Sequence, residues 1–284
     1  MTDRERYIIA VDMDGTLLNS QGQVTKRTAD TLQRLLDMGH YVTPASGRPF
    51  PLLPGAVAAL KGISYAVLEN GAVVWDWKNA RVLDTTSLPA GMAKRLLQDV
   101  KKEISGEKTD ARYYAEFFSQ GKAYADAADV EVLKSAGIYG NFTEYMLNGH
   151  VFLENFMEQD ALLNRAEKLN IYFEDEAFSA RFREKWSRTP EIYVTTSVSG
   201  NAEFNAPGVN KGAGLKLLMD RLGIAPDHVI AIGDNDNDLE MFAEAGHAVA
   251  MGNAAPNIKA AANHQTTDND HDGAAVFLEE FFRL

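Results

Sequence analysis

Two apolar runs in this chain each end in acidic residues, and this pairing constrains the fold more than any other feature. Residues 8–16 read IIAVDMDGT and residues 229–238 read VIAIGDNDND. Short apolar runs rich in β-branched residues are typical of strands buried on both faces of a parallel sheet. Burying a carboxylate is costly unless it is paired or bound to a metal. We therefore expect these acidic residues to share a cation or a chemical task.

Strand-like and helix-like segments alternate at both ends of the chain. Apolar runs predict strands at 7–11, 41–45 and 65–69, and helical spacing of leucines predicts a helix over 25–38. The rhythm resumes late in the chain, with further helices and strands expected at 211–222, 229–232, 238–245, 248–251, 257–262 and 274–282. This alternation predicts an α/β fold whose core is a doubly wound, Rossmann-like parallel sheet.

The middle of the chain has a different pattern. Helical spacing at 92–104 and 159–169 is mixed with short strand-like runs, including 191–198, and a turn at 199–201 leads into a strand-like run at 202–205. We expect a discontinuous core domain, residues 1–85 and 203–284, interrupted by an α+β domain inserted at 86–202.

Charge and composition exclude several classes of partner. The net charge is −12 and the chain has no cysteine, so disulfides, thiol nucleophiles and cysteine metal sites are excluded. A negative field repels nucleic acid and anionic membranes, and we expect neither as a partner. The charged start of the chain does not resemble a secretory signal and no apolar stretch is long enough to cross a bilayer. These observations predict a cytoplasmic protein, as a monomer or a small homo-oligomer.

The acidic clusters predict a metal site. The carboxyl ends of parallel strands meet at one crevice, so Asp12, Asp14 and Asp234 are expected to offer hard oxygen ligands suited to Mg²⁺. A calcium loop is excluded, because Leu239 replaces the loop glycine and Ala245 the bidentate glutamate. A solvated acidic turn is the alternative interpretation, and it suits Asp236 better than Asp234, because Asp234 directly follows an apolar run that we expect to be buried.

Two other segments predict an anion site. Ser46, Gly47 and Arg48 follow a predicted strand, and Lys211 begins a predicted helix, where free N–H groups also favour anions. An ordinary solvated lysine remains the alternative for Lys211. The Gly212–Gly214 segment is not a dinucleotide fingerprint, because no strand immediately precedes it. Mg²⁺, carboxylates and a lysine around an anion favour phosphoryl transfer.

These motifs together resemble the haloacid dehalogenase superfamily. DMDGT at 12–16, SG at 46–47, Lys211 and GDNDND at 233–238 match its four motifs in order, and the insertion resembles the C2-type (IIB) cap of its Cof-like phosphatases. Smaller segments agree: ENGA at 69–72, GVNKG at 208–212 and MGNA at 251–254. Serine at position 46 replaces the commoner threonine and keeps the hydroxyl.

The resemblance implies a role for each matching residue. Asp12 would be the nucleophile that forms an aspartyl-phosphate, and Asp14 would protonate the leaving oxygen and then deprotonate water. Mg²⁺ would be held by Asp12, the backbone carbonyl of Asp14, Asp234 and, in support, Asp238. The implied phosphate ligands are the N–H groups of Met13 and Gly47 and the side chains of Ser46, Lys211 and Asn237. Arg48 would either reach the substrate or pair with a neighbouring carboxylate.

The resulting hypothesis is a Mg²⁺-dependent phosphatase of small phosphorylated metabolites, sugar phosphates first. Two alternatives stay open. A phosphomutase would return the phosphoryl group to a sugar instead of water, and a non-enzymatic module would accept phosphate or sense a ligand, as a receiver domain does.

Overall fold

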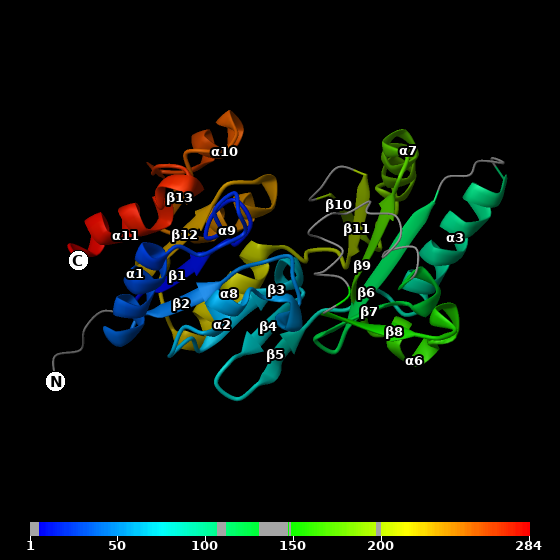
Figure 1. The fold of residues 1–284 in the computed structure, drawn as a ribbon, viewed down its shortest axis with the longest axis horizontal. Helices are drawn as coiled ribbons and strands as arrows, with labels where there is room; N and C mark the ends of the chain where they lie inside the picture. Colours follow the sequence, from blue (N-terminus) through cyan, green and yellow to red (C-terminus); the bar gives the residue numbers. More distant parts are fainter. Residues whose placement is uncertain (1–5, 107–111, 131–146, 148, 197–199) are drawn as a thin grey trace. The chain divides into compact units, whose positions relative to one another are not determined.

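The chain divides into two compact units. The computed structural model describes residues 6–106, 112–130, 147, 149–196 and 200–284. The first unit comprises Met1–Arg48, Leu53–Asp84 and Asn210–Leu284, and the second comprises Pro49–Leu52 and Thr85–Val209. Figure 1 labels the elements of both units.

A parallel sheet forms the centre of the first unit. Its strands are β1 (Ile8–Val11), β2 (Tyr41–Pro44), β12 (Val229–Gly233), β13 (His247–Ala250) and β14 (His264–Gln265). They are ordered β14-β13-β12-β1-β2, and each neighbouring pair is parallel. The strands expected at 7–11, 41–45, 229–232 and 248–251 are therefore confirmed. Successive strands are added outward from β1 on one side and from β12 on the other, so the strand order reverses between β12 and β1. In open α/β sheets, ligands bind at the carboxyl ends of the strands beside such a reversal.

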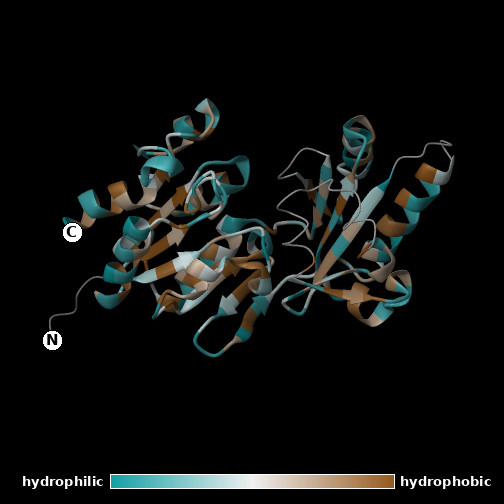
Figure 2. Cartoon of the chain, in the orientation of Figure 1, coloured by the Kyte–Doolittle hydropathy of each residue, from teal (hydrophilic) through white to brown (hydrophobic). Residues whose placement is uncertain are grey.

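Helices cover both faces of this sheet, because the strand side chains alternate between two apolar clusters. Ile9 and Val11 pack in one cluster, with α1 (Lys26–Asp37) and α11 (Gly273–Phe282). Ile8 and Ala10 pack in the other, with helices on the opposite face. Those helices are α8 (Lys211–Leu222), α9 (Leu239–Glu244) and α10 (Pro256–Ala261). Figure 2 shows the central strands in the hydrophobic colour and the helices two-toned. The doubly wound core is confirmed.

A smaller sheet adjoins the parallel one. It contains β3 (Tyr65–Leu68), β4 (Val73–Asp76) and β5 (Arg81–Thr85), in that order, and α2 (Gly55–Ala58) precedes it. A parallel bridge joins Ala45 to Val67, and the Ser46 N–H donates to the Val67 carbonyl at 2.9 Å. The end of β3 therefore lies beside the end of β2, so that residues after both strands reach one edge.

The second unit is an α+β domain built on a six-stranded sheet. Its strands are β6 (Tyr113–Ser119), β7 (Lys122–Asp126), β8 (His150–Leu153), β9 (Ala166–Phe173), β10 (Tyr193–Thr195) and β11 (Asn201–Asn205). The order is β10-β11-β9-β6-β7-β8. Within the described residues its helices are α3 (Met92–Gly106), α6 (Asp160–Leu163) and α7 (Glu176–Trp186).

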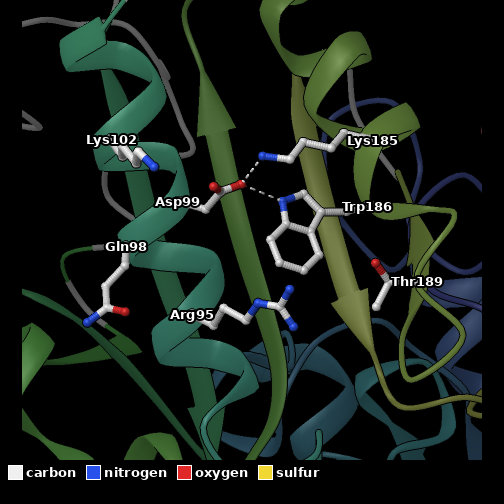
Figure 3. Close-up of a pocket in the computed structure, with 7 residues that line it drawn as sticks. All are labelled: Arg95, Gln98, Asp99, Lys102, Lys185, Trp186 and Thr189. Atoms are coloured by element: carbon white, nitrogen blue, oxygen red, sulfur yellow. Dashed lines mark hydrogen bonds and ion pairs between the residues drawn. The ribbon is translucent and has the colours of Figure 1, made fainter.

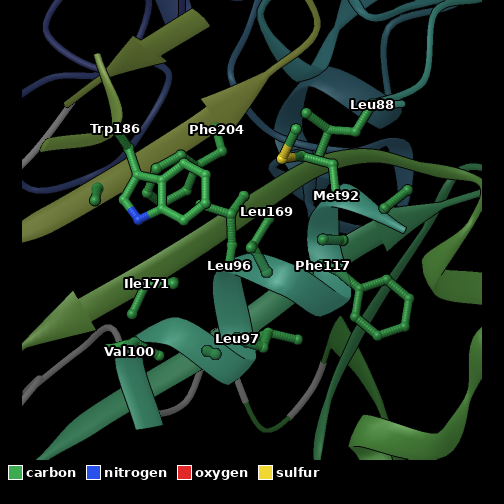
Figure 4. Packing of buried hydrophobic residues seen from close by; sticks show 14 of the residues in the cluster. Leu88, Met92, Leu96, Leu97, Val100, Phe117, Leu169, Ile171, Trp186 and Phe204 are labelled. Atoms are coloured by element: carbon green, nitrogen blue, oxygen red, sulfur yellow. The ribbon is translucent and has the colours of Figure 1, made fainter. Parts of the chain in front are cut away.

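One face of this sheet carries the apolar core of the unit. Leu96 and Val100 of α3 pack with Leu169, Ile171 and the other apolar side chains of the face, as Figure 4 shows. Phe178, Phe182 and Trp186 of α7 belong to the same cluster. The segment Pro49–Leu52 groups with this unit because Leu52 packs with Phe118 and Ala123.

Two sequence-based expectations differ from the structure. The helix expected at 159–169 is wrong: a short α6 ends at Leu163 and β9 begins at Ala166. Helical spacing holds through the leucines of α6, but Leu169, Ile171 and Phe173 alternate with polar side chains, which is the strand period. The chain returns to the first unit at Asn210 rather than at residue 203, because β11 pairs with β9 and β10. Residues 197–199 of the expected strand and turn lie outside the described residues.

No described helix combines the length and the apolar character needed to span a bilayer.

Candidate active site

The centre of the site is a buried lysine held between two carboxylates. Asp12 follows β1, and its N–H donates to the carbonyl of Ile232 at 3.0 Å, which ties it to β12. Lys211 is the first residue of α8 and is 0% exposed. Its Nζ contacts Oδ1 of Asp12 and lies 2.7 Å from Oδ1 of Asp238. The solvated-lysine alternative is therefore wrong.

Burial and charge shift the titration of this cluster. Burial, together with repulsion from Asp238 and Asp234, holds the pKa of Asp12 well above its usual range despite the attraction of Lys211. Burial alone would lower the pKa of Lys211, but Asp12 and Asp238 raise it above its ordinary value. The lysine therefore stays charged at every working pH. When ionised, the three carboxylates carry more negative charge than one lysine can balance, so a second cation would bind favourably.

The second acidic motif lies directly beside this pair. Asp234 follows β12 and accepts a 2.8 Å hydrogen bond from the hydroxyl of Thr16. Asp238 accepts from the N–H groups of Asp234 and Asn235 through Oδ2, at 2.9 and 3.1 Å. Gly15 has a φ of +87°, and a Cβ there would lie 2.4 Å from Oδ2 of Asp234. Only glycine allows the two acidic loops to approach this closely.

This cluster fits a divalent cation. Carboxylate oxygens of Asp12, Asp234 and Asp238 all lie within 4.8 Å of one another. An all-oxygen, carboxylate-rich donor set is what Mg²⁺ takes. Both carboxylate oxygens of Asp238 already accept hydrogen bonds, one from Lys211 and the other from backbone N–H groups. Asp238 would therefore be a supporting metal ligand rather than a principal one. Burial, and secondarily Asp238, raise the pKa of Asp234 to about 6 against the opposing hydrogen bond from Thr16.

Asp14 does not join the buried cluster through its side chain. Arg48 holds that carboxylate in a bidentate pair, with Nε and Nη2 at 2.9 and 2.5 Å from its two oxygens. Of the two alternatives for Arg48, the structure shows the pairing with a neighbouring carboxylate. The Asp14 side chain is 59% exposed and that of Arg48 25% exposed, so Asp14 remains open to a reacting group.

A third group of residues forms a polar rim after β2 and β3. The buried hydroxyl of Ser46 accepts from the N–H of Arg48 at 3.2 Å. Asn237 donates through Nδ2 to Oδ1 of Asn70 at 3.2 Å. A Cβ on Gly47 would lie 3.1 Å from the same Asn70 oxygen, so Asn70 lies against Gly47. Glu69 and Asn70 both have positive φ, +55° and +56°. Strain at consecutive non-glycine residues is typical of functional loops.

Three residues of the site had no role in the sequence-based hypothesis. Thr16 and Asn253 both contact Asp234, and Asn70 contacts Asn237. Asn253 also donates to the Gly15 carbonyl at 2.8 Å. Asn70 and Asn253 each follow a strand of the first unit closely, so the rule that ligands bind at carboxyl ends of strands provided a signal for both. The side chain of Met13 packs in the apolar core, which leaves only its backbone to face the site.

A hollow on the second unit is a weaker candidate. It has a volume of about 340 Å³ and lies between α3 and α7, as Figure 3 shows. Asp99 accepts from Nε1 of Trp186 at 3.0 Å and also pairs with Lys185. The guanidinium of Arg95 lies 5.1 Å from the Trp186 ring centroid. Asp99 is the one carboxylate among the described residues that line the hollow, so this lining lacks the acidic cluster that phosphoryl transfer needs.

Comparison with known proteins identifies a family and several relatives. A family model of haloacid dehalogenase-like hydrolases matches residues 9–278. The chain is 30% identical over 289 residues to the 5-amino-6-(5-phospho-D-ribitylamino)uracil phosphatase YitU of Bacillus subtilis (strain 168), with 98% of each sequence covered. A haloacid dehalogenase-like hydrolase from Bacteroides thetaiotaomicron superposes with a TM-score of 0.81 at 24% identity, covering 98% of this chain and all of that one. A subclass IIB sugar phosphatase superposes with a TM-score of 0.79 at 20% identity and the same coverage.

Proposed function

This chain belongs to the haloacid dehalogenase-like hydrolases and is a phosphoric monoester hydrolase, and we propose that it is a Mg²⁺-dependent phosphatase of small phosphorylated metabolites. One observation carries the proposal: a buried Lys211 joins Asp12 and Asp238 beside Asp234, at the carboxyl ends of β1 and β12. Together with Lys211, a divalent cation bound by these carboxylates would offset the charge of a phosphate dianion that the chain as a whole would repel.

Asp12 is the nucleophile in this proposal. Its carboxylate oxygen attacks phosphorus, the bond from phosphorus to the leaving oxygen breaks, and an aspartyl-phosphate forms. Asp14 gives its proton to the leaving oxygen, and the exposed side chain suits this task. In the second step Asp14 takes a proton from water, the water oxygen attacks phosphorus, and Asp12 is released with inorganic phosphate.

Arg48 positions Asp14. A bidentate guanidinium fixes the plane of a carboxylate more strictly than a single ammonium does. The pair therefore holds the acid–base group in one orientation while leaving it accessible.

In this proposal the phosphate oxygens are bound by groups from four segments of the first unit. Lys211 supplies charge, Ser46 its hydroxyl and Asn237 its amide, while Met13 and Gly47 supply backbone N–H groups. Asn70 supports two of these contacts, because it pairs with Asn237 and lies against Gly47. Catalysis of phosphoryl transfer is mostly such positioning and charge neutralisation.

Mg²⁺ would be held by Asp12, the backbone carbonyl of Asp14 and Asp234, with Asp238 in support. When bound, it supplies positive charge that screens the phosphate from the carboxylates and keeps Asp12 ionised. Thr16 and Asn253 orient Asp234 for this role.

Sugar phosphates and related polyol phosphates are the first substrates to examine. A structural neighbour is described as a sugar phosphatase, and YitU is named for a substrate that carries a phosphorylated ribityl chain. Both names point to small phosphorylated metabolites with hydroxyl-bearing leaving groups.

The test is phosphate release from a panel of phosphorylated metabolites with Mg²⁺ or with EDTA, for the wild-type chain, Asp12→Asn and Asp236→Asn. Asp236 is an exposed carboxylate in the same acidic motif as Asp234 and serves as the matched control. We expect Mg²⁺-dependent release that Asp12→Asn reduces by at least about 10³-fold, since no acyl phosphate can form. Asp236→Asn should retain the activity, and circular dichroism should show both variants folded.

Residual activity of Asp12→Asn within ten-fold of wild type would contradict the nucleophile assignment. Running the reaction in ¹⁸O-labelled water separates hydrolysis from mutase chemistry, because only hydrolysis places one labelled oxygen in the released phosphate.

A further inference from the structure

One stripe of α3 faces a hollow instead of the apolar core. Leu96 and Val100 of this helix are buried in the core of the second unit. A second stripe, spaced at i, i+3, i+4 and i+7, lines the hollow in Figure 3: Arg95, Gln98, Asp99 and Lys102. Lys185 and Trp186 of α7, and Thr189 just beyond it, also line this cavity, which we call the α3–α7 hollow.

The α3–α7 hollow is complete within one unit and has the size of a small-molecule site. All of its lining residues belong to the second unit. Its volume of about 340 Å³ lies within the range of cavities that bind small ligands. The charges that line it therefore decide which kind of small molecule it could bind.

The carboxylate in the middle of the hollow is already paired. Asp99 accepts a hydrogen bond from Nε1 of Trp186 at 3.0 Å and forms an ion pair with Lys185. Lys185 also pairs with Glu103, so two carboxylates share one ammonium. This part of the hollow has no surplus positive charge, and it would repel an anionic group placed beside Asp99.

Two other cations of the hollow have no carboxylate partner. Within the part of the chain that the structure describes, neither the guanidinium of Arg95 nor the ammonium of Lys102 forms an ion pair or a side-chain hydrogen bond. They are seven residues apart on one helix, which is about 10 Å along its axis. Figure 3 shows Asp99 between them. The hollow therefore has an unpaired cation toward each end, in a chain whose net charge is −12.

Trp186 orients one of these cations. Its side chain is buried, and the guanidinium of Arg95 lies over its ring, 5.1 Å from the centroid. A guanidinium that stacks on an aromatic ring keeps its N–H edge available for a carboxylate or phosphate, which it can bind through two parallel hydrogen bonds. Because the ring already restricts Arg95, less conformational entropy is lost when an anion binds.

We propose that the α3–α7 hollow binds a small molecule with an anionic group at each end and a neutral middle, such as a sugar bisphosphate or a linear dicarboxylate. Arg95 binds one anionic group and Lys102 binds the other. Asp99 excludes a third anionic group from the middle. The binding is noncovalent and uses no residue of the acidic cluster in the first unit, so it does not depend on the proposed phosphatase function.

Calorimetry of the full-length chain in metal-free buffer tests the site. Fructose 1,6-bisphosphate and adipate carry an anionic group at each end, whereas fructose 6-phosphate and hexanoate carry one at a single end. The buffer is freed of metal with a chelating resin, because EDTA is itself a polyanion. Without Mg²⁺, the carboxylates of Asp12, Asp234 and Asp238 disfavour the binding of phosphate at the acidic cluster.

We expect at least one of the two-ended probes to bind with a dissociation constant of about 1 mM or tighter. It should bind at least ten-fold more tightly than its single-ended counterpart. Binding of the bisphosphate alone identifies phosphate groups as the ligand, binding of adipate alone identifies carboxylates, and binding of both identifies the shared charge pattern. The proposal is overturned if neither two-ended probe binds, or if two-ended and single-ended probes bind equally well.

Variants of α3 then locate the binding. Arg95→Gln and Lys102→Gln should each weaken the two-ended probe at least ten-fold. Lys101→Gln is the matched control, since Lys101 is an exposed lysine of the same helix that does not line the hollow. It removes the same charge and should change the affinity less than two-fold.

Two results with these variants would also overturn the proposal. If Lys101→Gln weakens binding as much as Lys102→Gln does, the probes are attracted by diffuse surface charge and not by the hollow. If Arg95→Gln lowers the melting temperature but leaves the binding of the probes unchanged, Arg95 serves only to pack against Trp186.

Discussion

At the residue scale, Lys211 shows why the site works only as a whole. A lysine at the start of a helix opposes the helix dipole, and here it is also fully buried. Two carboxylates compensate for both costs, since its Nζ contacts Asp12 and Asp238. The lysine in turn lowers the repulsion among carboxylates that lie within 4.8 Å of one another. Each buried charge is tolerated only because the oppositely charged groups beside it offset its cost of burial.

Replacing this lysine should therefore weaken the fold as well as the activity. We expect Lys211→Met to lower the free energy of unfolding of the metal-free chain by about 3–5 kcal/mol, because it leaves buried carboxylates without their partner. Turnover should fall by about 10²–10³-fold with the loss of a charge that binds phosphate. Urea unfolding and phosphate release measure the two effects.

Lys216→Met is the matched control for this prediction. Lys216 lies on the same helix, but its side chain is 58% exposed and its ion pair with Glu244 spans 3.5 Å. Surface pairs of this kind contribute about 0–1 kcal/mol. The prediction would fail if the two variants lost equal stability, or if saturating Mg²⁺ stabilised Lys211→Met less than it stabilises the wild type.

The sequence was sufficient to predict which residues follow the strands, but not which contacts their side chains make. Asp12, Asp234 and Lys211 were identified because apolar runs and a helix start fix where they lie. The partner of Arg48 stayed open, because a side chain that follows β2 can reach either Asp14 or a substrate and only the folded distance decides. Asn70 had no assigned role, since its contact with Asn237 joins residues 167 positions apart.

At the element scale, β9 shows where periodicity alone is insufficient. Residues 159–169 contain leucines at helical spacing, and the helix continues only to Leu163. Ala166–Phe173 instead pairs with β6 on one side and β11 on the other. A central strand of eight residues gains two ladders of hydrogen bonds, which local helix propensity cannot match.

Glu167 at the start of β9 gives a prediction for the pH dependence of stability. The strand register shifts beside it, between Phe118 and Ser119, and its carboxylate is buried. Burial raises the pKa of Glu167 to about 7, against hydrogen bonds from Gln120 and Thr85. The folded chain therefore binds a proton there more tightly than the unfolded chain, whose glutamate has a pKa of about 4.3.

The sign of the effect follows from proton linkage. Because the folded state holds the extra proton between about pH 4.3 and 7, the free energy of unfolding contributed by this group falls as pH rises through that window and is constant above it. Glu167→Gln removes the titration, so the variant should gain up to about 3 kcal/mol over the wild type at pH 8 and little at pH 5. Thermal unfolding at both pH values measures this, with the exposed Glu154→Gln as control. A gain independent of pH would contradict the account.

At the scale of the whole molecule, the fold brings separate parts of a discontinuous unit to one acidic site. Alternating strands and helices were sufficient to predict this core and an α+β insertion. They could not predict where the chain returns to the first unit. The sequence of β11 is that of an ordinary short strand, and only its pairing with β9 assigns it to the second unit. The site then concentrates negative charge in a chain whose net charge is already −12. A metal ion should therefore bind with a strong dependence on pH.

Protons and Mg²⁺ compete for the same carboxylates. Asp234 has a pKa of about 6, and burial holds that of Asp12 well above its usual range. Mg²⁺ binds only the ionised forms, so its affinity should fall about ten-fold per pH unit below pH 6 for each proton that it displaces. Calorimetry at pH 5.5 and 7.5, in two buffers of different ionisation enthalpy, measures the affinity and the protons released. At 100 times its dissociation constant the ion should stabilise the chain by about 2.7 kcal/mol.

The negative net charge of the chain makes controls for nonspecific cation binding necessary in this measurement. A chain at −12 attracts any cation diffusely, and such attraction is screened by salt, whereas a buried site is screened much less. The titration is therefore repeated at matched ionic strength with NaCl and with Asp234→Asn, which removes a predicted ligand. Stabilisation that persists in salt but disappears in the variant identifies the site. Affinity that stays constant between pH 5.5 and 7.5, or survives in Asp234→Asn, would show that Mg²⁺ binds elsewhere on the acidic surface.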